Sequence, residues 1–276
     1  MATAVPAASA VFLGLLLLGV FSFLLRRGWS VLSLEFIFEP PLDGMTRGGV
    51  LTPLAGTVQL IVVSMLACIP VGVGTGLYFS EYAANGPFTK ALRLAIRCLA
   101  GVPSVVFGLF GLSFFVIFLG FGPSLLAASL TLACLALPLI VTASEQAFRA
   151  VPQDYRDASY ALGATKQQTI LKVVFPSAAS TIVTGAILSI GRVAGETAPI
   201  MFTGAAFYTS GIAASFFDEV MALPYHIYVM ATAGTNLEQT RPLQYGAILV
   251  LVGLVFGFSF MGVWMRMRIR AGERRS

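Results

Sequence analysis

The sequence has 276 residues, of which 57% are hydrophobic and only 11% charged, with a mean hydropathy of +0.88 and a formal net charge of +5. A soluble domain carries about 25% charged residues, so this composition excludes an ordinary soluble protein and indicates a membrane protein. The positive charge is spread over short polar segments and the C-terminal tail, which we interpret as orientation signals rather than a nucleic-acid-binding surface.

Long apolar runs predict the architecture. A transmembrane helix needs about 20 predominantly apolar residues, and no stretch alternates in hydrophobicity as a barrel strand would. The sequence therefore predicts an all-α, polytopic membrane bundle of about six transmembrane helices, near residues 7–25, 58–79, 99–120, 124–143, 180–203 and 244–264. The first run lacks the basic start and the A-x-A cleavage site of a signal peptide, so we expect a retained span.

Two details of this helix assignment can be checked directly. Only Gly120–Pro123 separates the third span from the fourth, which predicts a tight hairpin. Twelve of the 17 lysines and arginines lie in segments 81–98 and 145–176 and in the tail 265–276. We expect these segments and the C-terminus to be cytoplasmic. Six spans then place the N-terminus in the cytoplasm as well, although Arg26 and Arg27 weigh against this.

The segment 145–176 is a polar passage between two long apolar runs. Gly163 suits the left-handed residue that follows a helix, and Thr165 with Gln168 forms the T-x-x-Q pattern of a capping box. Pro176 is typical of a first helical turn and is expected to begin the fifth span. The pattern predicts two short helices that meet at a corner.

Small residues in this passage would let another protein approach the backbone closely. They are Ala158, Ser159, Ala161, Gly163 and Ala164. The residues alone leave open whether the passage is a docking element or an ordinary solvated loop.

Two charges fall within the fifth predicted span. Arg192 and Glu196 are four residues apart, on one face of the expected helix. A charge at the bilayer centre costs about 2.5–3.5 kcal/mol, so both should face the bundle interior. Either the pair only fixes helix packing, or Arg192 offers its fork of donors to an oxyanion while Glu196 positions it or repels unsuitable anions.

Further polar residues carry weaker signals. Thr197 and Thr203 could add hydroxyl donors to an anion pathway, although threonine in a membrane helix more often bonds the carbonyl four residues earlier. The three cysteines show no C-x-x-C spacing and His226 is the only histidine. We therefore expect no metal site, and a structural or interfacial role for His226.

The polar passage resembles the EAA loop of type I ABC importer permeases, which reads E-A-A, three residues, Gly, nine residues and I-x-L-P. Here Asp157-Ala158-Ser159 takes the place of E-A-A, Gly163 keeps its spacing, and Val173 to Pro176 close the pattern. In that family the loop is the coupling helix that docks on a separate ATPase subunit. The resemblance therefore assigns Asp157, Ala158, Ser159, Ala161, Gly163 and Ala164 to ATPase coupling.

Residues 48–264 further resemble the PstA-type permease of phosphate importers, most specifically in the run G-R-x-x-G-E-T-A-P at 191–199. An arginine at this position is implicated in the substrate pathway of that family, whereas sulfate and molybdate permeases differ after the Gly-Glu pair. The resemblance implies the type I permease fold and three parts: an N-terminal transmembrane helix with external linker (1–47), a permease core (48–264) and a basic cytoplasmic tail (265–276).

The function implied by the resemblance is import of inorganic phosphate by alternating access in the bacterial inner membrane. The implied partners are a second permease (PstC-type), two ATPase subunits (PstB-type) and an extracytoplasmic phosphate-binding protein (PstS-type). The sequence contains no G-x-x-x-x-G-K-[ST] loop. We therefore expect no enzyme activity and no cofactor on this chain, with ATP and Mg²⁺ bound by the ATPase.

Three other functions stay open from the residues. A permease for another oxyanion, such as sulfate or molybdate, would share every feature except the residues after Glu196. An ion-driven secondary transporter would need several carboxylates within its spans, and the predicted spans contain one. A membrane scaffold without transport activity is the third.

Overall fold

The computed structural model describes residues 4–84, 86–209, 211–233 and 237–273. Its α-helices are α1 (Ala4–Gly28), α2 (Leu34–Phe38), α3 (Leu51–Leu77), α4 (Pro87–Ala100), α5 (Ser104–Gly111), α6 (Leu125–Arg149), α7 (Gln153–Ala161), α8 (Lys166–Thr169), α9 (Phe175–Ala194), α10 (Ala198–Met201), α11 (Leu223–Thr232) and α12 (Leu237–Glu273). Three π-helical turns extend them, namely η3 (Tyr78–Tyr82), η4 (Leu112–Phe118) and η5 (Ile170–Val174). Short 3₁₀ turns form η1 (Trp29–Val31) and η2 (Asp43–Met45), and β1 (Pro41–Leu42) pairs antiparallel with β2 (Arg47–Gly48).

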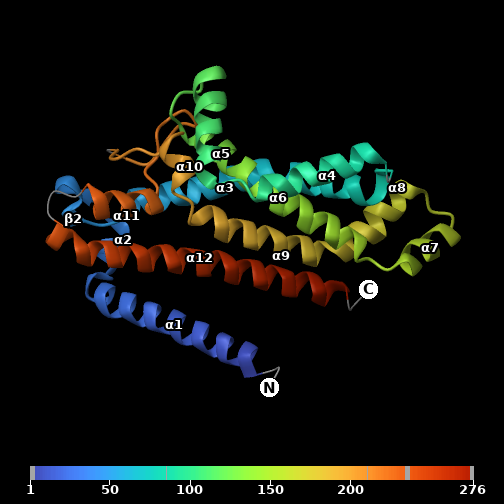
Figure 1. Cartoon of the computed structure of the whole chain (residues 1–276), viewed down its shortest axis with the longest axis horizontal. Coiled ribbons are helices and arrows are strands. Elements are labelled where there is room, and N and C mark those ends of the chain that lie inside the picture. Colours follow the sequence, from blue (N-terminus) through green and yellow to red (C-terminus); the bar gives the residue numbers. More distant parts are fainter. Residues whose placement is uncertain (1–3, 85, 210, 234–236, 274–276) are drawn as a thin grey trace.

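The centre of the molecule is a bundle of α3, α6, α9 and α12, which lie along its long axis (Figure 1). Buried apolar side chains of α3, α6 and α9 form the main core, among them Leu60, Leu132 and Ile140. The corner helices α7 and α8 lie at one end of the bundle, and β2 and α11 lie at the other (Figure 1). We call these the α7 end and the α11 end. The predicted all-α bundle is confirmed.

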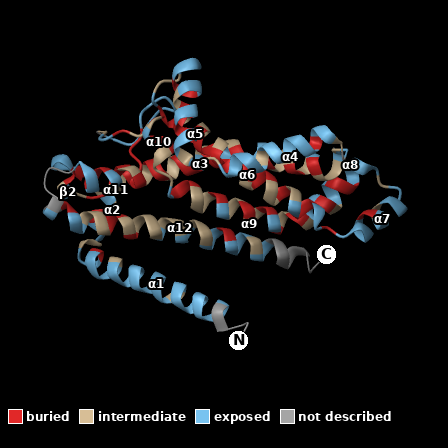
Figure 2. Cartoon of the chain, viewed as in Figure 1, coloured by how far each residue is buried: buried red, intermediate tan, exposed pale blue. Residues whose placement is uncertain are grey.

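Helix α1 stands apart from this bundle. It packs on α12 through contacts such as the edge-to-face pair Phe23–Tyr245, whose ring centroids are 5.7 Å apart. Figure 2 shows it exposed along most of its length, whereas buried residues fill the other long helices. Its apolar surface is therefore left for lipid or for another chain.

Among the residues that the structure describes, five helices are long and apolar enough to cross a membrane. They are Pro6–Val31, Leu51–Tyr82, Leu125–Arg149, Lys166–Ala194 and Thr240–Arg268. Each overlaps one predicted span, so spans one, two, four, five and six are confirmed as helices. The chain is thus a multi-pass membrane protein.

The third predicted span, 99–120, is wrong as a single straight helix. Helix α4 ends at Ala100, and the segment from α5 through η4 (Ser104–Phe118) leaves it at an angle of 103°, projecting sideways from the bundle (Figure 1). Pro103 cannot donate a backbone hydrogen bond, and it disfavours helical geometry at Val102. The predicted hairpin is present, because Gly120 (φ 69°) and Gly122 (φ 66°) turn the chain into α6.

The fifth span differs from the prediction at both ends. Pro176 does not begin it, because a continuous helical segment runs from Lys166 to Ala194. A proline inside an α-helix loses one hydrogen bond and clashes with the carbonyl four residues earlier. The wider turn η5 lies at that point, and the Ser177 hydroxyl donates to the Val173 carbonyl at 2.7 Å. The helix then ends at Ala194, well before residue 203.

The boundaries of the three predicted parts stay predictions. Helix α12 continues without a break across residues 264 and 265, so at least the first part of the tail extends a transmembrane helix. Arg274 and Arg275 lie outside the described residues.

Candidate functional site

The corner predicted from the polar passage is present at the α7 end. Helix α7 ends at Ala161, and Gly163 adopts φ 80°, as expected for the left-handed residue that terminates a helix. The Thr165 hydroxyl accepts the amide of Gln168 at 3.3 Å, and the Gln168 side chain accepts the amide of Thr165 at 2.9 Å. This capping box begins the helical segment that becomes the fifth span, so the second helix of the corner is long rather than short.

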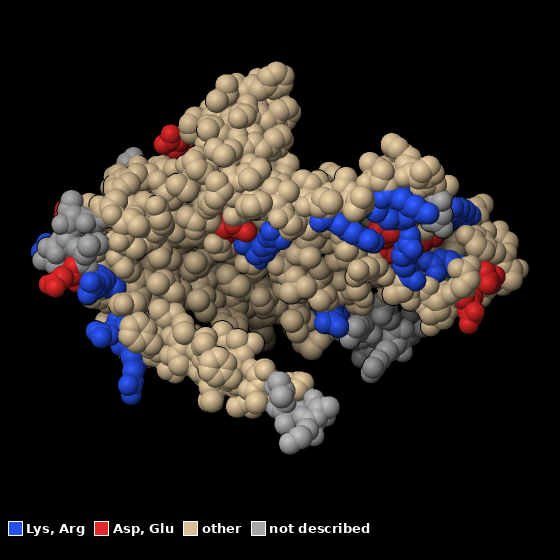
Figure 3. Space-filling view, viewed as in Figure 1, with Lys and Arg blue, Asp and Glu red and all other residues tan. Residues whose placement is uncertain are grey.

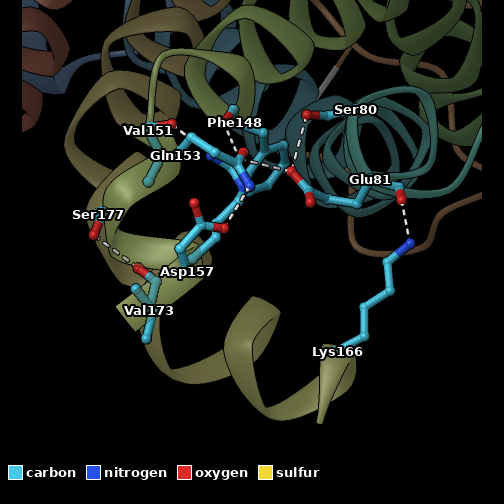
Figure 4. A network of polar contacts seen from close by, with 10 residues as sticks. Ser80, Glu81, Phe148, Val151, Gln153, Asp157, Lys166, Val173 and Ser177 are labelled. Atoms are coloured by element: carbon cyan, nitrogen blue, oxygen red, sulfur yellow. Dashed lines mark hydrogen bonds and ion pairs between the residues drawn. The ribbon is translucent and has the colours of Figure 1, made fainter. Parts of the chain in front are cut away.

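The residues assigned to ATPase coupling are grouped on this corner. Those that are exposed are Asp157, Ala158, Ala161 and Gly163. Asp157 accepts a hydrogen bond from Gln153 at 3.1 Å (Figure 4). Ser159 and Ala164 are half-buried, and the Ser159 hydroxyl contacts that of Thr169 at 2.9 Å. Ser159 thus fastens α7 to α8 and is not free for a partner.

Sequence reasoning missed the most exposed apolar residue of the corner. Leu162 is 90% exposed, directly before Gly163. Tyr155 and Tyr160 on α7 are also exposed. The sequence signal that could have revealed Leu162 is an apolar residue at the tip of a polar loop. Exposure of such a side chain to water is unfavourable unless another surface covers it.

A buried ion pair joins the corner to the inner bundle (Figure 4). The Arg156 guanidinium donates to Glu81 Oε1 at 2.9 Å and to the Phe148 carbonyl at 2.9 Å, and it also contacts the Val151 carbonyl. The side chains of Arg156 and Glu81 are only 11% and 10% exposed. Arg156 therefore ties α7 both to the end of α6 and to η3, the last turn of the α3 helix.

Lys166 reinforces this junction from the other side of the corner. Its ammonium group donates to the Glu81 carbonyl oxygen and lies 4.5 Å from the centroid of the Tyr82 ring. The first residue of α8 and the buried arginine of α7 thus hold the same turn. Glu81 and Arg156 are 75 residues apart, a pairing that no local sequence pattern reveals.

The second candidate site is the Arg192–Glu196 pair, which the structure brings together as predicted, but not on one continuous helix. Helix α9 ends at Ala194 with Gly195 as its C-cap, so Glu196 lies beyond it. Pro199 lies in the first turn of the next short helix, α10, and prevents α9 from continuing. Arg192 Nε and Glu196 Oε1 are 3.6 Å apart, with side chains 36% and 19% exposed.

This geometry leaves donors on Arg192 available. A separation of 3.6 Å is too long for a hydrogen bond, and within the described residues the Arg192 guanidinium makes no other ion pair. A half-exposed arginine at a break between two helices can therefore receive an oxyanion. Thr197 follows the pair directly and is half-buried.

Thr203 is placed differently from Thr197. Its side chain is fully buried, and its hydroxyl donates to the Pro199 carbonyl at 2.9 Å. This is the bond four residues back that is common for threonine in membrane helices. The Thr203 methyl group also packs against Gly111, so the side chain is enclosed by protein.

His226 lies on α11, outside the apolar helices, and is 3% exposed. Burial lowers the pKa of His226 to about 4, which keeps the ring neutral at physiological pH. In the part of the chain that the structure describes, no group of three or more metal-binding side chains occurs. The burial supports a structural role for His226.

Comparison with known proteins identifies the family. Residues 68–270 match the family described as "Binding-protein-dependent transport system inner membrane component". The "Probable ABC transporter permease protein YqgI" of Bacillus subtilis (strain 168) is 33% identical over 276 residues, covering 96% of this chain and 94% of that protein. The "Phosphate transport system permease protein PstA" of Mycobacterium leprae (strain TN) is 41% identical over 221 residues, covering 79% of this chain and 71% of that protein.

Solved structures with the same fold include two chains of ABC transporters. A chain of the inward-facing MetNI methionine ABC transporter superposes with a TM-score of 0.60 at 23% identity, over 80% of this chain and 94% of that chain. A chain of a bacterial ABC transporter for import of alginate gives a TM-score of 0.61 at 13% identity, over 95% and 97% of the two chains. The chain therefore belongs to the family of binding-protein-dependent transport system inner membrane components and has the fold of an ABC importer permease.

Proposed function

We propose that this chain is a permease subunit of an ATP-driven phosphate importer, in which inorganic phosphate passes beside Arg192. Phosphate is proposed as the substrate because the chain is 41% identical to a permease named for phosphate transport. The Arg192 guanidinium, which keeps free donors at the break between α9 and α10, supports this choice. Arginine suits this task because its planar fork matches the oxygens of phosphate.

The exposed corner is the proposed ATPase contact. Small residues on α7 allow a close approach, Asp157 offers a charge, and Leu162 offers an apolar side chain that a partner would remove from water. This proposal places the α7 end and the C-terminus in the cytoplasm, and the α11 end outside. The N-terminal end of α1 is then cytoplasmic as well.

Movement of the corner would reach the substrate path along one continuous helical segment. Residues Lys166–Ala194 form an unbroken helical rod of 29 residues, about 43 Å long at 1.5 Å per residue. The capping box sits at its first turn and Arg192 sits in its last. A tilt imposed at the corner therefore shifts Arg192 directly, which is the displacement that alternating access requires.

The Arg156–Glu81 pair would transmit the same movement to α3. Because both charges are buried, separating them would leave an unpaired charge out of water, at a cost of about 3–5 kcal/mol. Helix α7 and the end of α3 should therefore move together. We propose that movement of the corner displaces α3 and the helical segment Lys166–Ala194 together.

The proposed partners are those of such an importer: a second permease, two ATPase subunits and an external phosphate-binding protein, of the PstC, PstB and PstS types. ATP and Mg²⁺ would be bound by the ATPase, and this chain would have neither a cofactor nor an enzymatic site of its own. Localisation in the bacterial inner membrane follows from the same assignment.

Uptake by the reconstituted complex tests the proposal. Proteoliposomes loaded with ATP should accumulate labelled phosphate when the binding protein is outside, and a tenfold excess of sulfate or molybdate should compete weakly. Strong competition by sulfate or molybdate would assign the permease to another oxyanion. Accumulation that continues without ATP but follows an ion gradient would overturn the ATP-driven mechanism.

A further inference from the structure

A polar cavity of about 240 Å³ lies between α4, α6 and the turn η3, separate from the Arg192–Glu196 pair. Its charged lining comes from Arg93 and Arg97 on α4 and from Glu145 and Arg149 on α6. Phe79 of η3 closes one side. Lys and Arg side chains gather over this part of the molecule, between α4 and the α7 end (Figure 3).

The charges of this cavity do not balance. Arg93 Nε and Arg149 both lie 2.9 Å from the same oxygen, Glu145 Oε1. Arg97 has no acidic partner among the described residues. Three guanidinium groups and one carboxylate leave the cavity wall with two net positive charges at neutral pH.

One of these arginines is fixed in place before any ligand arrives. Arg93 donates to the Phe79 carbonyl at 2.8 Å, and its guanidinium lies 5.3 Å from the centroid of the Phe79 ring. Its side chain is 14% exposed. A guanidinium held in this way loses little conformational entropy on binding, so its remaining donors favour an oxyanion.

We propose that this cavity binds a phosphate group. A phosphate carries up to two negative charges and several acceptor oxygens, which match the two excess positive charges and the forked donors of Arg93, Arg97 and Arg149. The inference goes beyond the proposed function, because none of these residues contacts Arg192 or belongs to the corner.

Two sources can supply this chemistry. One is free inorganic phosphate. The other is the head group of an anionic phospholipid, since α4 also exposes apolar side chains such as Phe88 and Leu94 that suit acyl chains. Both sources bring phosphate oxygens to the same donors, but inorganic phosphate carries up to two negative charges and a lipid phosphodiester only one. Lipid composition separates the two sources experimentally.

Cysteine labelling inside the cavity measures occupancy without depending on transport. Thr142 lines the cavity and its hydroxyl bonds only its own helix, at the Pro138 carbonyl, so Thr142→Cys is a mild change. The exposed Cys98 is replaced by serine. The probe is the rate at which a sulfonate-bearing thiol reagent modifies the Thr142→Cys chain within the intact membrane complex.

The expected result is protection by phosphate. In neutral, lipid-free detergent, inorganic phosphate at ten times its dissociation constant should slow labelling about tenfold relative to chloride of equal ionic strength. If the ligand is a lipid, phosphate has no effect, but nanodiscs containing phosphatidylglycerol slow labelling relative to phosphatidylcholine alone. Equal rates under all four conditions would overturn the proposal.

Matched variants localise the effect. Arg97→Gln and Arg149→Gln should each remove most of the protection, whereas Lys90→Gln, one turn before Arg93 on α4 and outside the cavity lining, should keep it. If all three variants lost protection equally, the effect would arise from the general positive charge of this surface, and the proposed site would be overturned. Protection lost in Arg192→Gln but kept in Arg97→Gln would also overturn it, while leaving the proposed transport path intact.

Discussion

Arg192 is the residue on which the proposed substrate contact depends. Replacing it by lysine keeps the charge but removes the planar fork, so it should lose one charge-assisted hydrogen bond to phosphate. Such a bond contributes about 1.5–3 kcal/mol, which corresponds to roughly a 10- to 150-fold decrease in the uptake rate. Uptake of labelled phosphate at low concentration, with complex assembly checked by co-purification, measures the effect.

The control for this variant is Arg47→Lys. Arg47 is an exposed residue at the α11 end that approaches Asp43 only to 4.0 Å. Exposed pairs of this kind contribute at most about 1 kcal/mol, and here uptake should be unchanged. Normal uptake by the assembled Arg192→Lys complex would contradict the forked contact.

Arg156 is the residue on which the proposed coupling depends. Arg156→Gln leaves Glu81 buried without its partner, which should destabilise the junction by about 3–5 kcal/mol. We expect ATP hydrolysis to continue while phosphate uptake per ATP falls severalfold. Measuring both rates on the same proteoliposomes gives this ratio directly.

A second substitution distinguishes the ion pair from a general loss of stability. If the ion pair is the link, the ratio of uptake to hydrolysis should fall less in the double variant Arg156→Gln, Glu81→Gln than the sum of the decreases in the two single variants. The reason is that no unpaired charge remains in the double variant. Asp43→Asn, at the exposed pair of the α11 end, should leave the ratio unchanged. A normal ratio of uptake to hydrolysis in Arg156→Gln would rule out this link.

At the scale of single residues, the sequence predicted the features that depend on neighbouring positions. Gly163, Thr165 and Gln168 were assigned correctly because caps and left-handed residues depend on neighbours within a few positions. The Arg156–Glu81 pair depends on two segments folding together, so no pattern within either segment could reveal it.

Among elements, the corner between α7 and α8 depends on backbone geometry. Gly163 has φ 80°, and a Cβ there would meet nothing within 4 Å. Gly163→Ala should therefore cost only the left-handed strain, about 1–2 kcal/mol, and lower coupled uptake by loosening the corner. Asparagine tolerates this conformation better, so Gly163→Asn should be milder. Uptake and protease sensitivity of the corner measure the series.

Gly120 supplies the matched control for the corner. It has φ 69° and equally open space, but it lies in the turn between η4 and α6. Gly120→Ala should thus introduce similar strain without changing the protease sensitivity of the corner. If both variants loosened the corner equally, its geometry would not depend on Gly163.

Proline shows why element boundaries were harder to predict. Pro70, Pro138 and Pro242 lie inside continuous helices, whereas the chain breaks at Pro103. All four lie in or beside apolar sequence. Packing against neighbouring helices decides whether the lost hydrogen bond is tolerated, and the local sequence pattern does not reveal this packing.

Glycine motifs give the same lesson for helix contacts. Gly72 and Gly76 of α3 meet Ile140 and Ser144 of α6 so closely that no Cβ fits, whereas Gly253, in an identical G-x-x-x-G spacing, has nothing within 4 Å. The spacing permits close approach. Which face of which helix meets a neighbour is a property of the assembled bundle.

For the whole molecule, the composition and apolar runs predicted a multi-pass helical bundle, but not its arrangement. The runs do not reveal that α5 projects sideways or that α1 touches little besides α12 (Figures 1 and 2). Apolar surface facing lipid and apolar surface facing protein have the same composition, so hydropathy cannot separate them.

The long axis of the bundle permits a test of the entire proposal, because the corner and the α2–β2 segment lie at opposite ends. An Ala158→Cys chain, with Cys98 replaced by serine, carries an exposed thiol on α7. If an ATPase grips this corner, a short bifunctional thiol reagent should join the two chains. The yield should change when ATP replaces ADP, because closure of the ATPase dimer moves the contact. Asp43→Cys is exposed at the α11 end and should give no ATPase product under either nucleotide. Equal crosslinking from both positions would contradict a specific ATPase contact at the corner. No crosslinking from Ala158→Cys in a complex that still imports phosphate would mean that the ATPase contacts the chain elsewhere.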